Sequence, residues 1–104
     1  MASQSVLQYV RDTVNRSPAV IFSKSYCPYC NRAKKKLQDL KIDFVAVEVN
    51  LVENQQELAD SLFELTNQRT FPNIFIKGIH VGGCDDLFNK LGDGTVQQML
   101  SSER

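Results

Sequence analysis

Tyr26-Cys27-Pro28-Tyr29-Cys30 stands between a short apolar run and a helical pattern, and the rest of the chain is interpreted outward from it. Pro28 suits the first position of a helix, because its φ angle is preset and its missing N–H would have no partner there. Cys27 then falls at the N-cap, where free backbone N–H groups and the helix dipole make a sulfur easier to ionise. Cys30 falls about one turn inside the helix, where it is shielded. This asymmetry predicts an attacking thiol followed by a resolving thiol.

The hydrophobic pattern on both sides of this segment predicts an α/β fold. We expect a four-stranded mixed β-sheet flanked by about five α-helices, in the order α-β-α-β-α-β-β-α-α. The expected helices are 3–16, 28–40, a third that Asn50 or Asn54 caps and that ends near Thr66, 84–91 and 95–101; the expected strands are 19–22, 44–49, 73–76 and 79–81. In the second helix, Cys30, Ala33, Leu37 and Leu40 are expected to share one apolar face.

Length and charge narrow the class of protein. The 104 residues fit one domain, 1–104. Twelve basic residues balance twelve acidic ones, and no apolar run is long enough to span a bilayer, so we expect neither a nucleic-acid partner nor a membrane partner. The start of the chain lacks the features of a secretory signal, which favours the cytoplasm, although a removed organellar presequence stays open. Three cysteines make an odd count, which argues against a structural disulfide framework.

Two chemistries are open to the cysteine pair at this stage. A C-x-x-C motif beside a β-α-β pattern is typical of thioredoxin-like redox proteins. Zinc sites use the same spacing, and Cys27, Cys30, His80 and Cys84 would supply four ligands. The zinc interpretation requires Cys30 to turn away from its helix face, and Pro28 favours the redox interpretation.

Further candidate residues follow later in the chain. Pro72 precedes a strand and is a candidate for a cis peptide bond, with an ordinary trans bond as the alternative. A cis bond would leave the Phe71 backbone free to pair with a peptide-like substrate. A helix is expected to begin within Gly82-Gly83-Cys84-Asp85-Asp86, and the free N–H groups at a helix start bind carboxylates. The alternative interpretation is a plain Gly-rich turn with an N-capping Asp.

Basic residues form the last group of candidates. Lys24 and Arg69 are candidates for holding a substrate carboxylate. Lys34, Lys35 and Lys36 are interpreted as a solvated helix face.

Taken together, these features resemble those of a glutaredoxin. Cys27-Pro28-Tyr29-Cys30 is similar to the dithiol motif of that family, Thr70-Phe71-Pro72 to its Thr-Val-Pro segment, and Gly82-Gly83-Cys84-Asp85-Asp86 to its Gly-Gly-Cys-Asp/Ser-Asp segment. The resemblance implies a thioredoxin fold, a cis Pro72 and glutathione as the ligand and reducing cosubstrate, with no metal. The glutathione-binding residues that it implies are Lys24, Tyr29, Gln68, Arg69, Thr70, Phe71, Pro72, Gly83, Cys84, Asp85 and Asp86. Phe71 replaces the usual Val, which makes the groove bulkier.

The resemblance further implies the reaction and its partners. Cys27 would be the nucleophile that reduces protein–glutathione mixed disulfides and protein disulfides, and Cys30 the resolving thiol. Glutathione reductase with NADPH would act indirectly, and a monomer is expected. The alternative function is a dimeric carrier of a glutathione-ligated [2Fe–2S] cluster. A thioredoxin is a further alternative, but the Trp that usually precedes its motif is replaced here by Tyr26.

Overall fold

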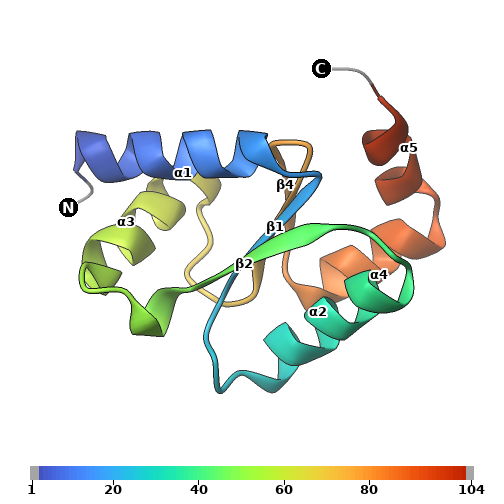
Figure 1. Cartoon of the computed structure of the whole chain (residues 1–104), viewed down its shortest axis with the longest axis horizontal. Coiled ribbons are helices and arrows are strands. Elements are labelled where there is room, and N and C mark those ends of the chain that lie inside the picture. The colour runs from blue at the N-terminus through green and yellow to red at the C-terminus, as the bar shows by residue number, and fades with distance from the viewer. Residues whose placement is uncertain (1–2, 103–104) are drawn as a thin grey trace.

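The computed structural model describes residues 3–102. Its helices are α1 (Gln4–Arg16), α2 (Pro28–Asp39), α3 (Gln55–Thr66), α4 (Cys84–Gly92) and α5 (Thr95–Ser101); its strands are β1 (Ala19–Ser23), β2 (Phe44–Glu48), β3 (Asn73–Ile76) and β4 (Ile79–Gly82), with a 3₁₀ turn over Val49–Leu51. The predicted order of elements and the α/β class with a four-stranded mixed sheet are therefore confirmed (Figure 1).

The sheet has the order β2-β1-β3-β4. β1 pairs with β2 in parallel and with β3 in antiparallel orientation, and β3 pairs with β4 as a hairpin. The α2 crossover between β1 and β2 explains the parallel pair, because two parallel strands need a connection of this length. The central strand β1 is buried along its whole length.

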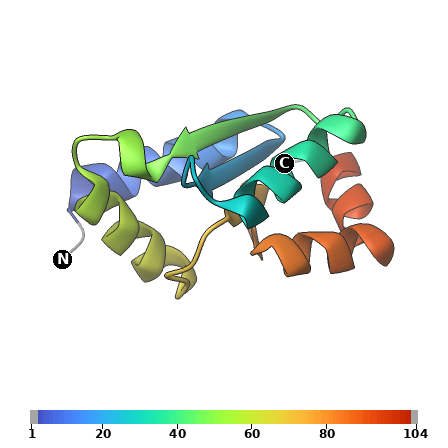
Figure 2. The ribbon, with the colours of Figure 1, turned by 90° about the horizontal axis from the view of Figure 1, so that it is seen from below.

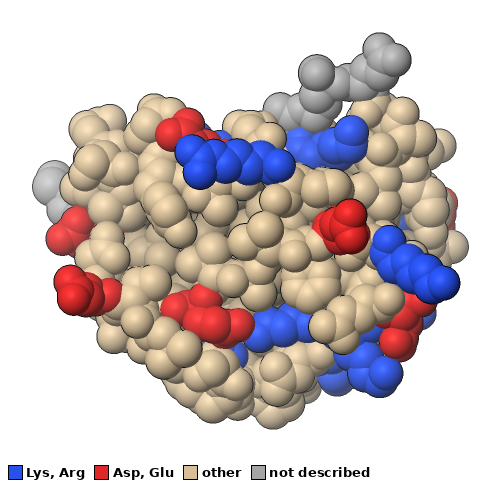
Figure 3. All heavy atoms as spheres, viewed as in Figure 1, with Lys and Arg blue, Asp and Glu red and all other residues tan. Residues whose placement is uncertain are grey.

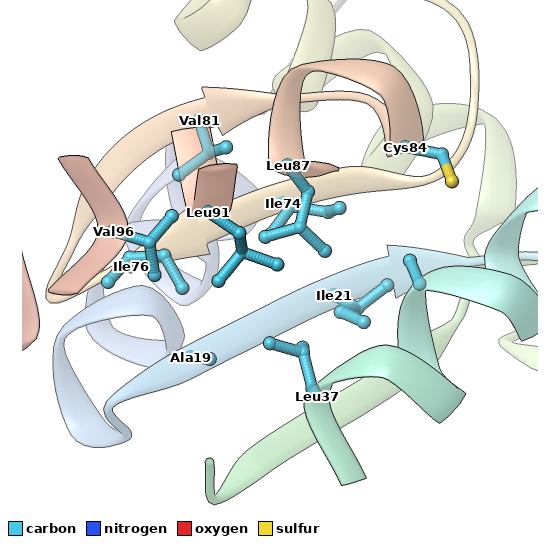
Figure 4. Packing of buried hydrophobic residues seen from close by; sticks show 11 residues of the cluster. Ala19, Ile21, Leu37, Ile74, Ile76, Val81, Cys84, Leu87, Leu91 and Val96 are labelled. Carbon is cyan, nitrogen blue, oxygen red and sulfur yellow. The ribbon is translucent and has the colours of Figure 1, made fainter. Parts of the chain in front are cut away.

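Alternation along the strands divides the core into two layers. Ala19 and Ile21 of β1 pack with Leu37 of α2 and with Leu87 of α4. Figure 4 shows this layer, with Cys84 at one edge of it. On the other face of the sheet, Phe22 packs with residues of α1 and α3, a set that includes Val6, Val10, Val14, Leu58 and Leu62.

The helices accordingly cover opposite faces of the sheet. Figure 1 shows α1 and α3 together at one side of the molecule and α2, α4 and α5 at the other, and Figure 2 shows the same division from a second direction. Cys27 lies where β1 leads into α2.

Several boundaries differ from the sequence-based prediction. The second strand ends at Glu48, one residue early, because the chain turns into the 3₁₀ helix. Leu40 is wrong as a core residue: it lies just beyond α2 and is 44% exposed. Asn54 occupies the N-cap of α3 without a side-chain capping bond, whereas Asn50 bonds Ser25 instead.

Charged side chains of both signs are interspersed on the face in Figure 3, without one large patch of a single sign. No helix in the described part of the chain has the length and apolar character needed to cross a membrane.

Candidate active site

Cys27 is the N-cap residue of α2, and Pro28 occupies the first turn, as the sequence predicts. The backbone N–H of Cys30 donates a hydrogen bond to Cys27 Sγ over 3.2 Å. A helix-start N–H bonds a thiolate more strongly than a thiol, because charged acceptors make stronger hydrogen bonds. Cys27 is half-buried, so its sulfur can meet a substrate.

Cys30 is fully buried on the inner face of α2. Burial raises the pKa of the Cys30 thiol to about 11, its hydrogen bond and charge interaction with Cys27 add to this, and the Lys34 charge acts in the opposite direction. The two thiols of the motif therefore differ as predicted: one sits at an accessible helix start and the other inside the protein.

The loop after α3 carries a cis peptide bond between Phe71 and Pro72, which confirms the prediction for Pro72. The Cys27 thiol points to the Phe71 carbonyl oxygen over 3.8 Å, so this loop lies directly against the attacking sulfur. Gln68 Nε2 donates to the carbonyl oxygens of Thr70 and Pro72, each over 2.9 Å. One side chain therefore braces the loop on both sides of Phe71.

The start of α4 forms the opposite wall of the site. Gly83 is its N-cap, and the Gly83 N–H donates to Asp86 Oδ2 over 3.0 Å. Asp86 thus caps the helix, and both Asp85 and Asp86 are exposed. Cys84 is buried, and burial raises the pKa of its thiol, so Cys84 behaves as an apolar neighbour of the site.

These walls enclose an open groove of about 400 Å³. Its lining consists of Tyr29, Gln68, Thr70, Phe71, Pro72, Gly83, Cys84, Asp85 and Asp86. The structure thus brings together nine of the eleven residues that the resemblance implies for binding.

The two basic candidates do not line this groove. Arg69 donates to Asp60 Oδ1 over 3.1 Å and stacks on the Phe63 ring at 4.1 Å, which holds it against α3. Lys24 Nζ lies over the Phe71 ring at 5.2 Å. Neither arrangement tests a ligand contact, so their binding roles stay predictions.

The four candidate zinc ligands do not come together as a metal cluster in the described part of the chain. His80 Nε2 bonds Asn73 Oδ1 over 2.8 Å, and Asn73 Nδ2 donates to Thr66. Among residues 3–102, no group of three or more His, Cys, Asp or Glu side chains is placed to hold a metal ion. His80 instead belongs to a polar network beside the cis peptide bond, a role that sequence reasoning missed.

A second polar cluster was also missed. Lys34 Nζ forms a 2.6 Å ion pair with Glu48 Oε2, and Ser23 donates to the other carboxylate oxygen. The Lys34 side chain is only 19% exposed, so the solvated-face prediction is wrong for this lysine. It holds for Lys35, which is 76% exposed. Ser23 and Glu48 lie at the ends of the neighbouring strands β1 and β2, and this feature of the sequence could have predicted the cluster.

Comparisons with known proteins place this geometry in a family. The family model described as Glutaredoxin matches residues 19–81. The chain belongs to the glutaredoxin family. It is 43% identical to Glutaredoxin-C2 of Arabidopsis thaliana over 91% of this chain and 86% of that protein. It is 37% identical to Monothiol glutaredoxin-S6 of Oryza sativa subsp. japonica over 99% of this chain and 79% of that protein.

A solved structure agrees with the match. The crystal structure of a buckwheat glutaredoxin–glutathione complex superposes with a TM-score of 0.90 at 39% identity, covering 94% of this chain and 89% of that one. As a glutaredoxin, this chain is a thiol oxidoreductase of thioredoxin fold, and the close pair Cys27 and Cys30 fits a dithiol active site.

Proposed function

We propose that this glutaredoxin is a dithiol, glutathione-dependent oxidoreductase that reduces protein–glutathione mixed disulfides and protein disulfides. The observation that carries the proposal is the difference between its two thiols. Cys27 sits at a helix N-cap beside an open groove, and Cys30 lies one turn further on with no exposed surface. Disulfide exchange needs one accessible thiolate, and the dithiol route also needs a second, shielded thiol that attacks the mixed-disulfide intermediate.

In the first route, the Cys27 thiolate attacks the glutathione sulfur of a mixed disulfide. A disulfide forms between Cys27 and glutathione, the protein thiolate leaves, and it takes up a proton. A second glutathione thiolate then attacks the sulfur of the bound glutathione, which releases glutathione disulfide and restores Cys27. In the dithiol route, Cys27 attacks a protein disulfide and forms a mixed disulfide with one of its sulfurs. Cys30 then attacks Cys27 Sγ, which releases the reduced protein and leaves a Cys27–Cys30 disulfide. Two glutathione molecules reduce that disulfide and leave as glutathione disulfide.

The groove offers groups that complement glutathione, the molecule that the buckwheat relative binds. Its volume of about 400 Å³ lies in the range of small-molecule sites. The Phe71 carbonyl oxygen lies 3.8 Å from Cys27 Sγ, which supports a pairing of the Phe71 main chain with the cysteinyl unit. The N-terminus of α4 suits the carboxylate of the γ-glutamyl end, and the exposed Asp85 suits its ammonium group.

The glycyl carboxylate would then lie toward Lys24 and Arg69. Since Arg69 is paired with Asp60, it would have to exchange this partner for the ligand. Glutathione reductase and NADPH would regenerate glutathione, and we infer the cytoplasm as the compartment. Pro28 and the dithiol motif favour this function over the cluster-carrier alternative.

The decisive experiment is an NADPH-coupled assay with glutathione, glutathione reductase and a small glutathione mixed disulfide. We expect Cys27→Ser to abolish turnover, because it removes the nucleophile. Cys30→Ser should keep substantial activity on the mixed disulfide and lose activity on a protein disulfide. Full activity of Cys27→Ser would overturn the proposal, as would equal losses of Cys30→Ser on both substrates.

A further inference from the structure

Lys34 is held in an unusual position for a helix lysine. Its ammonium group forms a 2.6 Å ion pair with Glu48 Oε2, and the side chains of the two residues are 19% and 23% exposed. Ser23, which is fully buried at the end of β1, donates to the remaining oxygen of Glu48. Ser23 and Glu48 are register partners in the parallel pair of β1 and β2, so the sheet itself fixes the carboxylate.

The same lysine lies one helical turn after the resolving cysteine. Residues at i and i+4 of a helix are neighbours, with about 5–6 Å between their Cβ atoms. Cys30 and Lys34 have this spacing within α2. Because the pair with Glu48 keeps the lysine from swinging into solvent, its charge stays near Cys30, and the limited exposure reduces screening by salt. The Lys34 charge opposes the effect of burial on the pKa of Cys30.

We propose that Lys34, held by Glu48 and Ser23, is a positioning residue that speeds the resolving step by stabilising the thiolate of Cys30. This inference rests on the dithiol route proposed above. The cluster of Ser23, Lys34 and Glu48 is not part of the groove lining.

The step is a simple exchange. The thiol of Cys30 loses its proton and attacks Cys27 Sγ of the mixed disulfide. The bond between Cys27 and the substrate sulfur breaks, the bond between Cys27 and Cys30 forms, and the released substrate thiolate takes up a proton. In the reverse direction Cys30 is the leaving thiolate, so an ammonium group held on the next turn of α2 favours both directions.

The test uses stopped-flow reaction of the reduced protein with dithiobis(nitrobenzoate), a symmetric aryl disulfide that yields a coloured thiolate. The first release reports the attack of Cys27 and depends on reagent concentration. The second reports the attack of Cys30 and does not. We expect Lys34→Gln to slow the second release about three- to tenfold, because the thiolate fraction falls more than the nucleophilicity of each thiolate rises. The first release should keep its rate.

Lys35→Gln is the matched control, since Lys35 is the next residue of α2 and pairs with Asp39 at the exposed surface. Both of its phases should match those of the wild type. In the Cys30→Ser background, Lys34→Gln should change nothing, because the residue through which it acts is gone. The double variant Lys34→Gln/Glu48→Gln removes both charges of the pair, so Glu48 is not left as an unpaired carboxylate. Its second release should remain as slow as in Lys34→Gln.

The outcomes separate this inference from the proposed function. A wild-type second phase in Lys34→Gln, or recovery in the double variant, would overturn the role of Lys34 while leaving the dithiol route intact. If the wild-type protein shows no second release that Cys30→Ser removes, the dithiol route itself has failed.

Discussion

Replacing Gln68 with alanine should loosen the loop that carries Phe71 and Pro72. The Gln68 amide donates two hydrogen bonds of 2.9 Å, to the carbonyl oxygens of Thr70 and Pro72. The bond to Thr70 is exposed, so water replaces it at little cost, whereas the bond to Pro72 is partly buried. A neutral hydrogen bond contributes about 0.5–1.5 kcal/mol, and here the bond to Pro72 is the one that counts, so we expect a loss of roughly 0.5–1.5 kcal/mol in the free energy of unfolding.

The same change should weaken substrate binding. The loop faces Cys27 through the Phe71 carbonyl, and a loosened loop must be ordered when the ligand binds. If most of the lost free energy is spent on this ordering, KM for the glutathione mixed disulfide rises about three- to tenfold. We expect kcat to stay near the wild-type value, because neither cysteine is touched.

Urea unfolding and the NADPH-coupled assay measure the two quantities. Gln8→Ala is the control, since the Gln8 amide donates a 2.9 Å bond to Asp12 on the exposed face of α1, away from the groove. Its stability should change by no more than about 0.5 kcal/mol and its KM not at all. An unchanged KM and an unchanged stability in Gln68→Ala would refute the bracing role. A raised KM with wild-type stability would show that Gln68 contacts the ligand directly.

Three further changes test the fold around the site. Burial raises the pKa of Glu48, but the hydrogen bonds from Lys34 and Ser23 and the Lys34 charge outweigh burial and hold the pKa below its usual value. The wild type should therefore be more stable than Glu48→Gln in urea unfolding, with the full advantage above about pH 4.5. This advantage should disappear as the pH falls further, because the carboxylate becomes protonated. Gly82→Ala should lower the stability measured by thermal unfolding by about 1–3 kcal/mol or more, because φ is +123° and the new Cβ would lie 2.2 Å from the Asp86 carboxylate oxygen that caps α4. Gly92→Ala is the control: its new Cβ would have nothing within 4 Å, so the change should be neutral or slightly stabilising. Leu37→Ala should cost about 2–5 kcal/mol as a core truncation, while Leu51→Ala, at a position that is 71% exposed, should stay within about 0.5 kcal/mol; equal losses would contradict the assigned core.

Much of the fold follows from local patterns. Val6, Val10 and Val14 recur at helical spacing and are buried against the sheet. Ser17 before Pro18 ends the first helix because the residue before a proline avoids the helical region. Such signals depend only on neighbours along the chain. The misplaced Leu40 shows their limit, since spacing alone does not tell where a helix ends.

The groove was predicted through the resemblance of three short motifs, and the structure brings most of the named residues together. The resemblance did not show how those residues hold one another. Gln68 braces the loop, and Asp86 caps its own helix, because each finds a backbone group that only the folded chain places nearby. The hydrogen bond from Arg69 to Asp60 of α3 likewise depends on the folded chain.

By itself, the sequence determined the order of the elements and the asymmetry of its two thiols, since proline geometry, the helix start and the helical period are all properties of a few consecutive residues. Tertiary structure decided which partner each charged side chain meets. Lys34 belongs to a run of three lysines that the sequence does not distinguish, yet in the fold Lys34 pairs with Glu48, whereas Lys35 pairs with Asp39. The register of β1 against β2 brings Ser23 and Glu48 together, and pairings between residues far apart in the chain exist only once that register is set.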